Sequence, residues 1–323
     1  MELTSKLETW RFARPFKIAF KTRTQLNLVS VALRDGEHIG RGEGIGVSYR
    51  GETAQSVLED IERVRPQIEA GVDRDALESL LPAGGARNAL DCALWDLECK
   101  RERRSIFELT ETSANAVQSV YTISVDTPEI MAEQARTGPS THLKIKLDAE
   151  IPVERVQAIR EARPDAVLIV DANQSWTIDL VKRVAEPLAE LGVAMIEQPL
   201  RAGEDKALDN YTAPVPIGAD ESVQTVDDLE GLASGYSVIN IKLDKTGGLT
   251  GAFALADAAR ARGYELMVGC MAGTSLSMAP AFVIAQRCRF VDIDGPLLLA
   301  DDRLPGMSYD QGKVTAQSPN LWG

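Results

Sequence analysis

The sequence predicts an α/β protein in which a barrel of parallel strands follows a smaller α+β domain. Three observations lead to this prediction. In the second half of the chain, a residue that is in most cases charged follows an apolar run every 22 to 27 residues, which is the period of a strand with its crossover helix. The first 110 residues or so lack this period. The chain has 323 residues, more than the roughly 250 of a typical barrel, so a second domain fits beside it.

The N-terminal region combines strand signals with helix signals. The alternating stretch 26–35 and the glycine-rich stretch 38–46 predict antiparallel strands and turns. Helices are predicted over 53–70 and 86–103, and in the second helix apolar residues recur at spacings of three and four. These elements predict an α+β domain over residues 1–112.

Seven positions mark the ends of the predicted barrel strands, in a domain that we place at 113–300. Barrel active sites form at the C-terminal ends of the strands, so we expect these residues to meet at the barrel mouth. The segment 301–323 has no room for another β/α unit, and we expect it to pack back on the first domain. The seven positions are Lys146, Asp171, Glu197, Asp220, Lys242, Gly269 and Asp294.

Three of these positions predict a metal site. A single Asp after a strand commonly caps the next helix, but Asp171, Glu197 and Asp220 follow three successive strands at equivalent positions, so their oxygens can converge. Hard carboxylate oxygens favour Mg²⁺. Zinc is disfavoured because neither His38 nor His142 follows a barrel strand and no cysteine is paired with a histidine.

The lysines predict bases beside this metal site. Lys144 and Lys146 are two residues apart on one strand, so both side chains point into the barrel. Lys242 follows the acids by one strand and reaches the metal from the other side. Buried like charges and a nearby cation lower the pKa of a lysine, so one of them can act as a neutral base. We expect Lys245 to belong to the following loop, in which 247–248 form a tight turn.

The composition of the chain limits the classes of partner that it is expected to bind. A formal net charge of -13 argues against a nucleic-acid backbone or an anionic membrane as partner. The chain has no apolar run of the roughly 18 residues that a membrane span needs, and its N-terminus lacks a signal-peptide core. We therefore expect a cytoplasmic protein that acts on a small molecule, with its oligomeric state, including a homo-oligomer, left open. The cysteines, predicted to be buried free thiols, are Cys92, Cys99, Cys270 and Cys288.

The motifs KIK, DAN, IEQP, ADES and NIKLDKTGG, in this order and spacing, resemble those of the muconate-lactonizing subgroup of the enolase superfamily. The resemblance covers nearly the whole chain. Within the subgroup, VDIDGP resembles the DxD signature of dipeptide epimerases, and LPAGGARNALDCALWDLE and INIKLDKTGG are similar to stretches of L-Ala-D/L-Glu epimerases. This resemblance implies a modified TIM barrel of the (β/α)7β form with an α+β capping domain, one Mg²⁺, and epimerisation of the C-terminal residue of a dipeptide from murein.

The resemblance also implies a role for each matched residue. An α-hydrogen beside a carboxylate is a very weak acid, and Mg²⁺ can stabilise the ene-diolate that forms when it leaves, as the enolase-superfamily sites illustrate. The implied roles are Asp171, Glu197 and Asp220 as metal ligands, Lys146 and Lys242 as the two bases, Lys144 as a carboxylate-binding neighbour that lowers the pKa, and Thr122 as a substrate contact.

Two further groups are predicted to select the substrate. Asp292 and Asp294 share one face of the last strand and form an anionic clamp for an α-ammonium, although a solvent-exposed helix cap is the alternative. A cation on the loop after the first strand would read a glutamate side chain, with Arg23 as the first choice and Lys21 as the second.

Two other functions stay open. A muconate cycloisomerase or an o-succinylbenzoate synthase would use the same metal and lysines, but their substrates carry no ammonium for the clamp. A non-catalytic binding barrel would have lost an acid or a lysine, whereas this sequence retains them all. The range of dipeptides and the pathway are not determined by the sequence.

Overall fold

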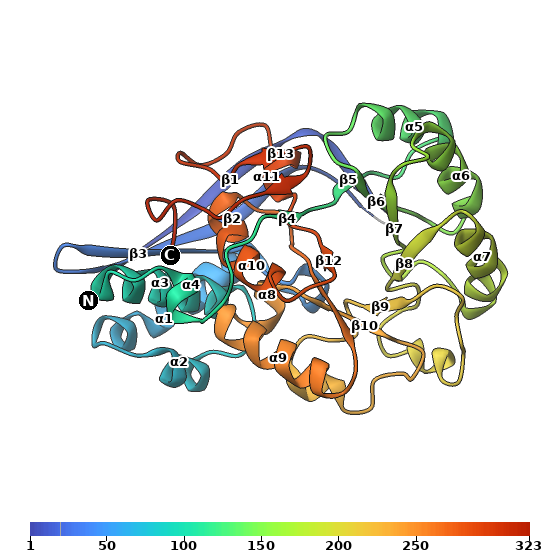
Figure 1. Ribbon diagram of the computed structural model, residues 1–323. Helices are drawn as coiled ribbons and strands as arrows, with labels where there is room; N and C mark the ends of the chain where they lie inside the picture. The colour runs from blue at the N-terminus through green and yellow to red at the C-terminus, as the bar shows by residue number, and fades with distance from the viewer. Residues whose placement is uncertain (20) are drawn as a thin grey trace.

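The computed structural model of the protein describes residues 1–19 and 21–323. It places a small antiparallel sheet with its helices beside a barrel of parallel strands, and both termini lie on the side of the small sheet (Figure 1). The strands and helices predicted for this region are present as β2, β3, α1 and α3. The elements of the region are β1 (Glu2–Ile18), β2 (Lys21–Asp35), β3 (His38–Gly44), α1 (Ala54–Glu69), α2 (Arg74–Leu80), α3 (Gly85–Glu102) and α4 (Ile106–Leu109).

The glycines of β3 allow α3 to pack closely on the sheet. Gly40, Gly42 and Gly44 alternate along the strand, and each faces the backbone of α3. A Cβ atom at Gly42 would lie 2.0 Å from the carbonyl oxygen of Ala89, a separation that no side chain can adopt. Most of the glycine-rich stretch is therefore a strand that carries no side chain on its helix-facing side.

The barrel has eight parallel strands in the order β12-β11-β10-β9-β8-β7-β6-β5. The backbone N–H of Val120 donates to Val291 O at 2.9 Å and joins the two ends of the sheet. The predicted fold class is thus confirmed. The strands are β5 (Tyr121–Ile123), β6 (His142–Lys146), β7 (Val167–Asp171), β8 (Val193–Glu197), β9 (Ile217–Ala219), β10 (Val238–Ile241), β11 (Glu265–Val268) and β12 (Phe290–Val291).

The connections between the strands are not all α-helical. After β8 and β9 the chain forms 3-10 turns, at Asp205–Leu208 and Val226–Leu229, instead of crossover helices. The first of these connections is rich in Gly, Pro, Asn and Asp, which favour turns over helix. The helices are α5 (Pro128–Thr137), α6 (Pro152–Ala162), α7 (Ile178–Glu190), α8 (Leu243–Thr246), α9 (Leu249–Ala261), α10 (Ser275–Ala285) and α11 (Gly295–Leu298).

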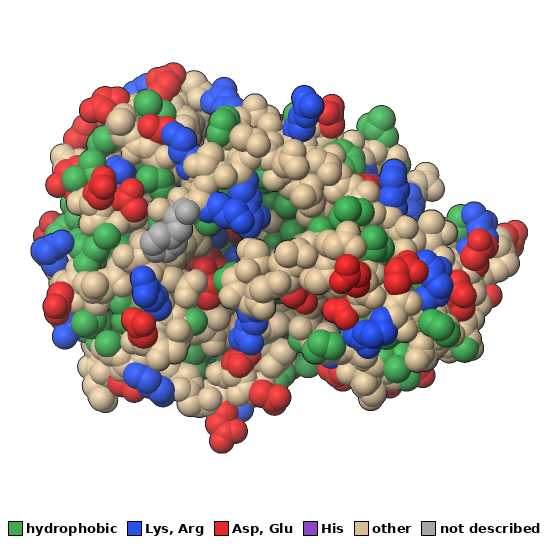
Figure 2. Space-filling model, turned by 180° about the vertical axis from the view of Figure 1, so that it is seen from behind, with side chains coloured by type: hydrophobic (Ala, Val, Ile, Leu, Met, Phe, Trp, Pro, Cys, Tyr) green, Lys and Arg blue, Asp and Glu red, His purple; other side chains and the backbone are tan. Residues whose placement is uncertain are grey.

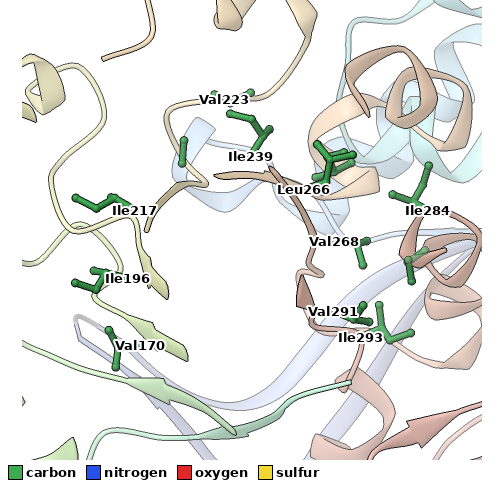
Figure 3. Close-up of a cluster of buried hydrophobic side chains, with 14 of the residues drawn as sticks. Val170, Ile196, Ile217, Val223, Ile239, Leu266, Val268, Ile284, Val291 and Ile293 are labelled. Atoms are coloured by element: carbon green, nitrogen blue, oxygen red, sulfur yellow. The ribbon is translucent and has the colours of Figure 1, made fainter. Parts of the chain in front are cut away.

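Side chains alternate between the two faces of the barrel strands. Val170 and Ile196 belong to the layer that packs toward the helices (Figure 3), whereas Ile169 and Met195 belong to a separate cluster inside the barrel. On β6, Ile145 belongs to the outer layer. The period of two therefore turns the polar residues on either side of Ile145 into the barrel.

Buried carboxylates fasten the small sheet to the barrel mouth. Glu43, at the end of β3, accepts hydrogen bonds from Thr274 N at 2.9 Å and Thr274 Oγ1 at 2.6 Å. Asp244 accepts a hydrogen bond from Ile45 N at 2.8 Å, and burial raises its pKa to about 6. These contacts fix the strand ends of the small domain above the mouth.

The C-terminal segment contacts the first domain. Trp322 is fully buried and donates from Nε1 to Cys92 O at 2.9 Å, and Gly323 N donates to Asp96 Oδ1 at 2.8 Å. The divisions at residues 112 and 300 stay a prediction. A second small sheet joins this segment to the chain before the barrel, with β4 (Val117–Gln118), β13 (Tyr309–Asp310) and β14 (Lys313–Val314).

Acidic and basic side chains are interspersed on the face of the molecule shown in Figure 2. None of the helices in the described part of the chain has the length and apolarity that a membrane span requires.

Candidate active site

The strand ends and the small domain enclose a cavity of about 120 Å³ at the barrel mouth. Nine of the eleven residues that the sequence suggested for the site line this cavity. The other two, Asp171 and Glu197, contact the lining residue Lys144. The cavity is lined from the barrel by Thr122, Lys144, Lys146, Asp220, Lys242, Asp292 and Asp294, and from the small domain by Phe16, Ile18, Lys21, Arg23, Ser48 and Tyr49.

Lys144 lies at the centre of a group of carboxylates. Its Nζ atom is 2.7 Å from Asp292 Oδ2, 2.8 Å from Glu197 Oε2 and 3.1 Å from Asp171 Oδ2. Burial alone would lower the pKa of Lys144, but the three carboxylates outweigh it and hold the pKa well above its ordinary value. The side chain is therefore a fixed ammonium group that links the predicted clamp to two of the predicted metal ligands.

The two predicted bases lie on opposite sides of the mouth. Lys146 ends β6 and Lys242 follows β10, four strands away in a barrel of eight. Lys146 Nζ donates to Asp171 Oδ2 at 2.5 Å, and Lys242 Nζ donates to Asp220 Oδ2 at 2.7 Å. A small molecule held between them would meet one amine on each face.

Lys144 lowers the pKa of Lys242, as expected for like charges, but the net shift of this pKa is upward. Burial alone would lower its pKa, but the adjacent Asp220 carboxylate outweighs burial and raises the pKa well above its ordinary value. The prediction considered only the lysines and the metal, whereas a carboxylate in direct contact with the Lys242 amine dominates its pKa.

The three predicted metal ligands are buried at the ends of neighbouring strands. Asp171 and Glu197 end β7 and β8, and Asp220 follows β9. Burial alone would raise the pKa of Asp171, but Lys146 and Lys144 outweigh it and lower the pKa to about 2. Burial and the nearby Asp171 raise the pKa of Glu197 to about 7.

This group fits a divalent cation through one unsatisfied oxygen. Glu197 Oε1 accepts a hydrogen bond from Asn240 Nδ2 at 2.8 Å, but Glu197 Oε2 has no hydrogen-bond partner among the described residues, although Lys144 Nζ is 2.8 Å away. A buried carboxylate oxygen needs a positive charge beside it, which Lys144 supplies here and which a divalent cation would also supply. The ligand oxygens of Asp171, Glu197 and Asp220 do not all lie within 4.8 Å of one another. Lys144 pairs with the first two of these acids, and Lys242 pairs with the third.

Lys245 belongs to the site, so its assignment to the loop is wrong. Its fully buried Nζ atom donates to Asp220 Oδ1 at 2.8 Å, to Asp220 O at 2.6 Å and to Asn240 O at 2.8 Å. The short helix α8 begins directly after Lys242, so one turn brings Lys245 back beside Asp220. The spacing of three residues between the lysines was the available signal.

Gln198 is a second residue that the sequence analysis missed. Its Oε1 accepts hydrogen bonds from Asp220 N at 2.8 Å and Ser222 N at 3.2 Å. Its Nε2 has Leu200 O, Ser222 Oγ and Tyr236 OH within 2.9 Å. The buried amide thus ties the end of β8 to the loop that carries Asp220. The only signal for this role in the sequence was the position of Gln198 in the IEQP motif.

Two more polar atoms in the cavity have no partner among the described residues. They are Asn173 Oδ1 and Glu221 Oε2. Burial and the adjacent Asp220 raise the pKa of Glu221 to about 8. Both residues follow predicted ligands in the DAN and ADES motifs, which was the signal that could have found them.

The two acids of the predicted clamp are buried just beyond β12. Asp292 Oδ2 accepts a hydrogen bond from Lys144 Nζ, while Asp292 Oδ1 has no hydrogen-bond partner in the described part of the chain. Asp294 Oδ2 accepts a hydrogen bond from Thr122 N at 2.7 Å. Burial and the nearby Asp292 raise the pKa of Asp294 to about 7. An oxygen of each acid and Cys270 Sγ lie within 4.8 Å of one another.

This burial rules out the alternative of a helix cap in solvent. Asp294 precedes α11, yet its side chain makes no capping hydrogen bond there. Asp292 and Asp294 are 4% and 1% exposed. Two carboxylates kept this close in a buried site suit a cationic ligand, because each raises the energy of the other's charge.

The predicted cations of the small domain line the cavity from above. Arg23 lies within β2, where it pairs with Phe16, and not on a loop as expected. Arg23 Nη2 donates to Ser48 Oγ at 3.1 Å, and Lys21 is exposed at the start of β2. Tyr49, which the sequence analysis missed, lies next to Ser48, and burial raises the pKa of its hydroxyl.

Two protein-family models match this chain. Residues 129–317 match the enolase C-terminal domain-like family, and residues 1–110 match the N-terminal domain of the mandelate racemase / muconate lactonizing enzyme family. This chain belongs to the mandelate racemase / muconate lactonizing enzyme family. The predicted membership of the enolase superfamily is confirmed.

Two relatives of this chain are named as an epimerase and a racemase. The chain is 45% identical over 311 residues to the L-Ala-D/L-Glu epimerase of Escherichia coli K12, covering 95% of this chain and 97% of the relative. It is 41% identical over 300 residues to the N-acetyl-D-glutamate racemase of a Pseudoalteromonas species, covering 92% and 95%.

Solved structures of the family share the fold. An enolase family member from Agrobacterium tumefaciens with bound sodium and L-Ala-L-Glu has a TM-score of 0.96 and 42% identity, with 99% of each chain covered. A dipeptide epimerase from Methylococcus capsulatus, complexed with Mg and L-Arg-D-Lys, has a TM-score of 0.92 and 29% identity, with 99% of this chain and 98% of that chain covered.

Proposed function

We propose that this family member is a Mg²⁺-dependent dipeptide epimerase that interconverts L-Ala-L-Glu and L-Ala-D-Glu. The observation that carries the proposal is the placement of two lysines on opposite sides of the mouth, next to a pair of buried acids that suits an ammonium group. The names of the E. coli and M. capsulatus relatives support it. A role in the metabolism of murein peptides in the cytoplasm is part of the proposal and rests on the sequence resemblance.

Asp171, Glu197 and Asp220 would hold the Mg²⁺. When bound, the cation offsets the negative charge that builds on the substrate carboxylate as the α-hydrogen leaves. Lys144 lies beside two of these acids and provides a fixed ammonium for the same carboxylate. A cation on these carboxylates also weakens their attraction for the lysines, which makes it easier for an amine to lose a proton.

The two lysines exchange protons with the α-carbon. Lys146 Nζ, as a neutral amine, takes the hydrogen from one face and leaves its electron pair on the substrate. Lys242 Nζ, as an ammonium, returns a proton to the opposite face, so the configuration inverts. In the reverse direction the roles are exchanged. Each turnover therefore requires one neutral and one protonated lysine at the same time.

The remaining residues orient the dipeptide. Asp292 and Asp294 bind the α-ammonium by charge-assisted hydrogen bonds, and the hydrogen bond from Thr122 N holds Asp294 in place. Arg23, held by Ser48, pairs with the glutamate side chain, and Lys21 adds positive charge beside it. The dipeptide would thus lie with its two ends in oppositely charged surroundings.

N-acylglutamate racemisation is a second candidate, favoured by the 41% identity to the N-acetyl-D-glutamate racemase. N-acetylglutamate has the same glutamate end and lacks the ammonium. The free Oδ1 of Asp292 and the burial of both acids favour the dipeptide, because an acetyl group would leave this oxygen without a hydrogen-bond donor and Asp294 without a cationic partner.

The test is solvent exchange with both substrates. The protein is incubated in D₂O with Mg²⁺ and either L-Ala-L-Glu or N-acetyl-L-glutamate, and the α-deuterium content and the D-epimer are followed by mass spectrometry and NMR. We expect a kcat/KM for the dipeptide that is about 100-fold higher, because losing a buried ion pair costs about 2–5 kcal/mol. Turnover of N-acetylglutamate without turnover of the dipeptide would reverse the assignment.

A further inference from the structure

We propose that a cavity beside the active site binds the side chain of the first residue of the dipeptide, accepts long side chains there and prefers anionic to cationic ones. The inference rests on the proposed dipeptide epimerase activity and names the substrate class of one end of the site. This cavity of about 290 Å³ lies between the first strand and the barrel.

The cavity adjoins the active site. The two share Phe12, Phe16, Thr122 and Leu298 as common walls. The second cavity therefore lies directly beside the space that would hold a ligand at the barrel mouth.

A bulge in β1 builds the outer wall. Arg11 pairs with Gln25 and Phe16 with Arg23, so five steps on β1 correspond to two on β2. The extra residues arch away from the sheet. Phe12 forms an isolated bridge with Leu299, and the chain at the bulge is further held by the hydrogen bond from Ala300 N to Arg11 O at 2.9 Å.

The clamp places the first residue at this wall. The α-ammonium and the side chain of that residue share one carbon, so a side chain next to the Asp294 carboxylate starts beside Thr122, which donates its N–H to that carboxylate. Thr122 also belongs to the wall common to both cavities. An alanine methyl group fills little of a space of about 290 Å³. The cavity therefore has room for a longer side chain.

The charge of the lining favours an anion. Of the charged residues in the lining, Lys17 and Asp126 pair with each other at 3.0 Å. Arg14 is exposed and has no ion pair with any residue in the described parts of the chain. One guanidinium is thus left to meet a carboxylate, with the side chains of Tyr121 and Gln134 also in the lining.

The experiment compares dipeptides that differ only in the first residue. For the full-length wild type with Mg²⁺, kcat/KM is measured for Ala-Glu, Met-Glu, Glu-Glu and Lys-Glu. We expect Met-Glu to react within about threefold of Ala-Glu, and Glu-Glu to exceed Lys-Glu by about threefold, as for a pair in partial contact with solvent. Added salt should reduce the second ratio.

Three variants test the assignment. Arg14→Gln should bring the ratio of Glu-Glu to Lys-Glu close to one, whereas Arg11→Gln, an exposed control on the same strand, should leave this ratio unchanged. Ala13→Phe places a bulky group in the lining, so the ratio of Met-Glu to Ala-Glu should fall at least tenfold.

The outcomes separate this inference from the proposed function. Turnover of Ala-Glu without turnover of Met-Glu or Glu-Glu would overturn the subsite and leave the epimerase assignment standing. A loss of all four substrates in equal proportion on Arg14→Gln would show that Arg14 shapes the bulge and does not read charge, which also overturns the inference. Absence of Ala-Glu turnover in the wild type would instead refute the proposed function itself.

Discussion

The two halves of the barrel mouth differ in how tightly their charged groups are held. From β6 to β10, the ammonium groups of Lys144, Lys146 and Lys242 each lie within 2.7 Å of a buried carboxylate. On the side of the small domain, Arg23 has one hydrogen bond to the neutral Ser48, and Lys21 is exposed. Chemistry that every substrate shares is thus built from rigid strand ends, whereas selection between substrates depends on groups that are free to pair with the ligand.

The largest effect is expected when a predicted metal ligand is removed from the strand ends of the barrel mouth. Glu197→Gln keeps the size of the side chain and removes the charge, so kcat should fall about 10⁴-fold, equivalent to about 5 kcal/mol of transition-state stabilisation. EDTA treatment of the wild type should have the same effect, reversed by Mg²⁺. Glu186→Gln, on the exposed face of α7, is the matched control. Full activity after exhaustive removal of metal would refute the metal site.

The two lysines should separate into half-reactions. Lys146→Ala and Lys242→Ala should each reduce epimerisation by about 10²- to 10⁴-fold, while each variant still exchanges the α-hydrogen of one epimer with solvent deuterium. Mass spectrometry of each epimer after incubation in D₂O provides the measurement. Lys182→Ala, at an exposed position, serves as control. If both variants exchange the same epimer, the lysines do not act from opposite faces.

A substitution at Gln198 tests whether the hydrogen bonds that position Asp220 matter for metal binding. Gln198→Met removes the hydrogen bonds to Asp220 N and Ser222 N, so the Asp220 carboxylate should lose its position. We expect Mg²⁺ or Mn²⁺ affinity, measured by calorimetry without substrate, to fall about 10- to 100-fold. The exposed Gln157→Met is the control. A variant that melts at a lower temperature but binds metal as tightly as the wild type would show a purely structural role.

A substitution at Arg23 tests whether the side of the mouth formed by the small domain selects the substrate. Arg23→Ala should reduce kcat/KM for Ala-Glu about tenfold or more, because an ion pair lost from a partly desolvated site costs about 2–5 kcal/mol, whereas Ala-Leu should be little affected. Arg34→Ala, exposed on the same strand, is the matched control. An equal loss for both dipeptides would mean that Arg23 supports the fold of the site and does not read the side chain.

The smallest expected effect is the pH dependence of the clamp. Burial and Asp292 raise the pKa of Asp294 to about 7, so the protonated acid predominates below this pH and the ionised form above it. Because only the carboxylate balances an α-ammonium, kcat/KM for Ala-Glu should rise about threefold between pH 6.5 and 7.5. The rise should be absent in Asp294→Asn. Its persistence in that variant would assign it to another group.

The residues at the strand ends of the barrel mouth were located from the sequence far better than those of the small domain. The strand ends at Lys146, Asp171 and Glu197 were found because parallel β/α units repeat at a regular spacing and place equivalent positions at one rim. This placement also predicted a metal site with bases beside it, and the resemblance of the motifs added the role of each residue in dipeptide epimerisation. The crossovers after β8 and β9 were expected as helices and are 3-10 turns, because spacing counts residues without specifying how the chain between strands folds.

Misplaced and missed residues share a different property. Arg23 was expected on a loop and lies on β2, and Lys245 and Gln198 were not assigned to the site although each contacts Asp220. Their positions depend on partners outside their own strand or turn. Neither hydrophobic periodicity nor the spacing of charges records which partner a buried polar group will meet.

The sequence by itself determined the barrel and the family and predicted the side chains that would bind a metal and move a proton, because these follow from local periodicity and from motifs of adjacent residues. Only the tertiary structure decided how the buried charges are paired and that a bulge in β1 opens a second cavity beside the clamp. The physical reason is that a buried ionic group is stabilised by partners brought together from distant strands. Those contacts exist only once the sheet has closed.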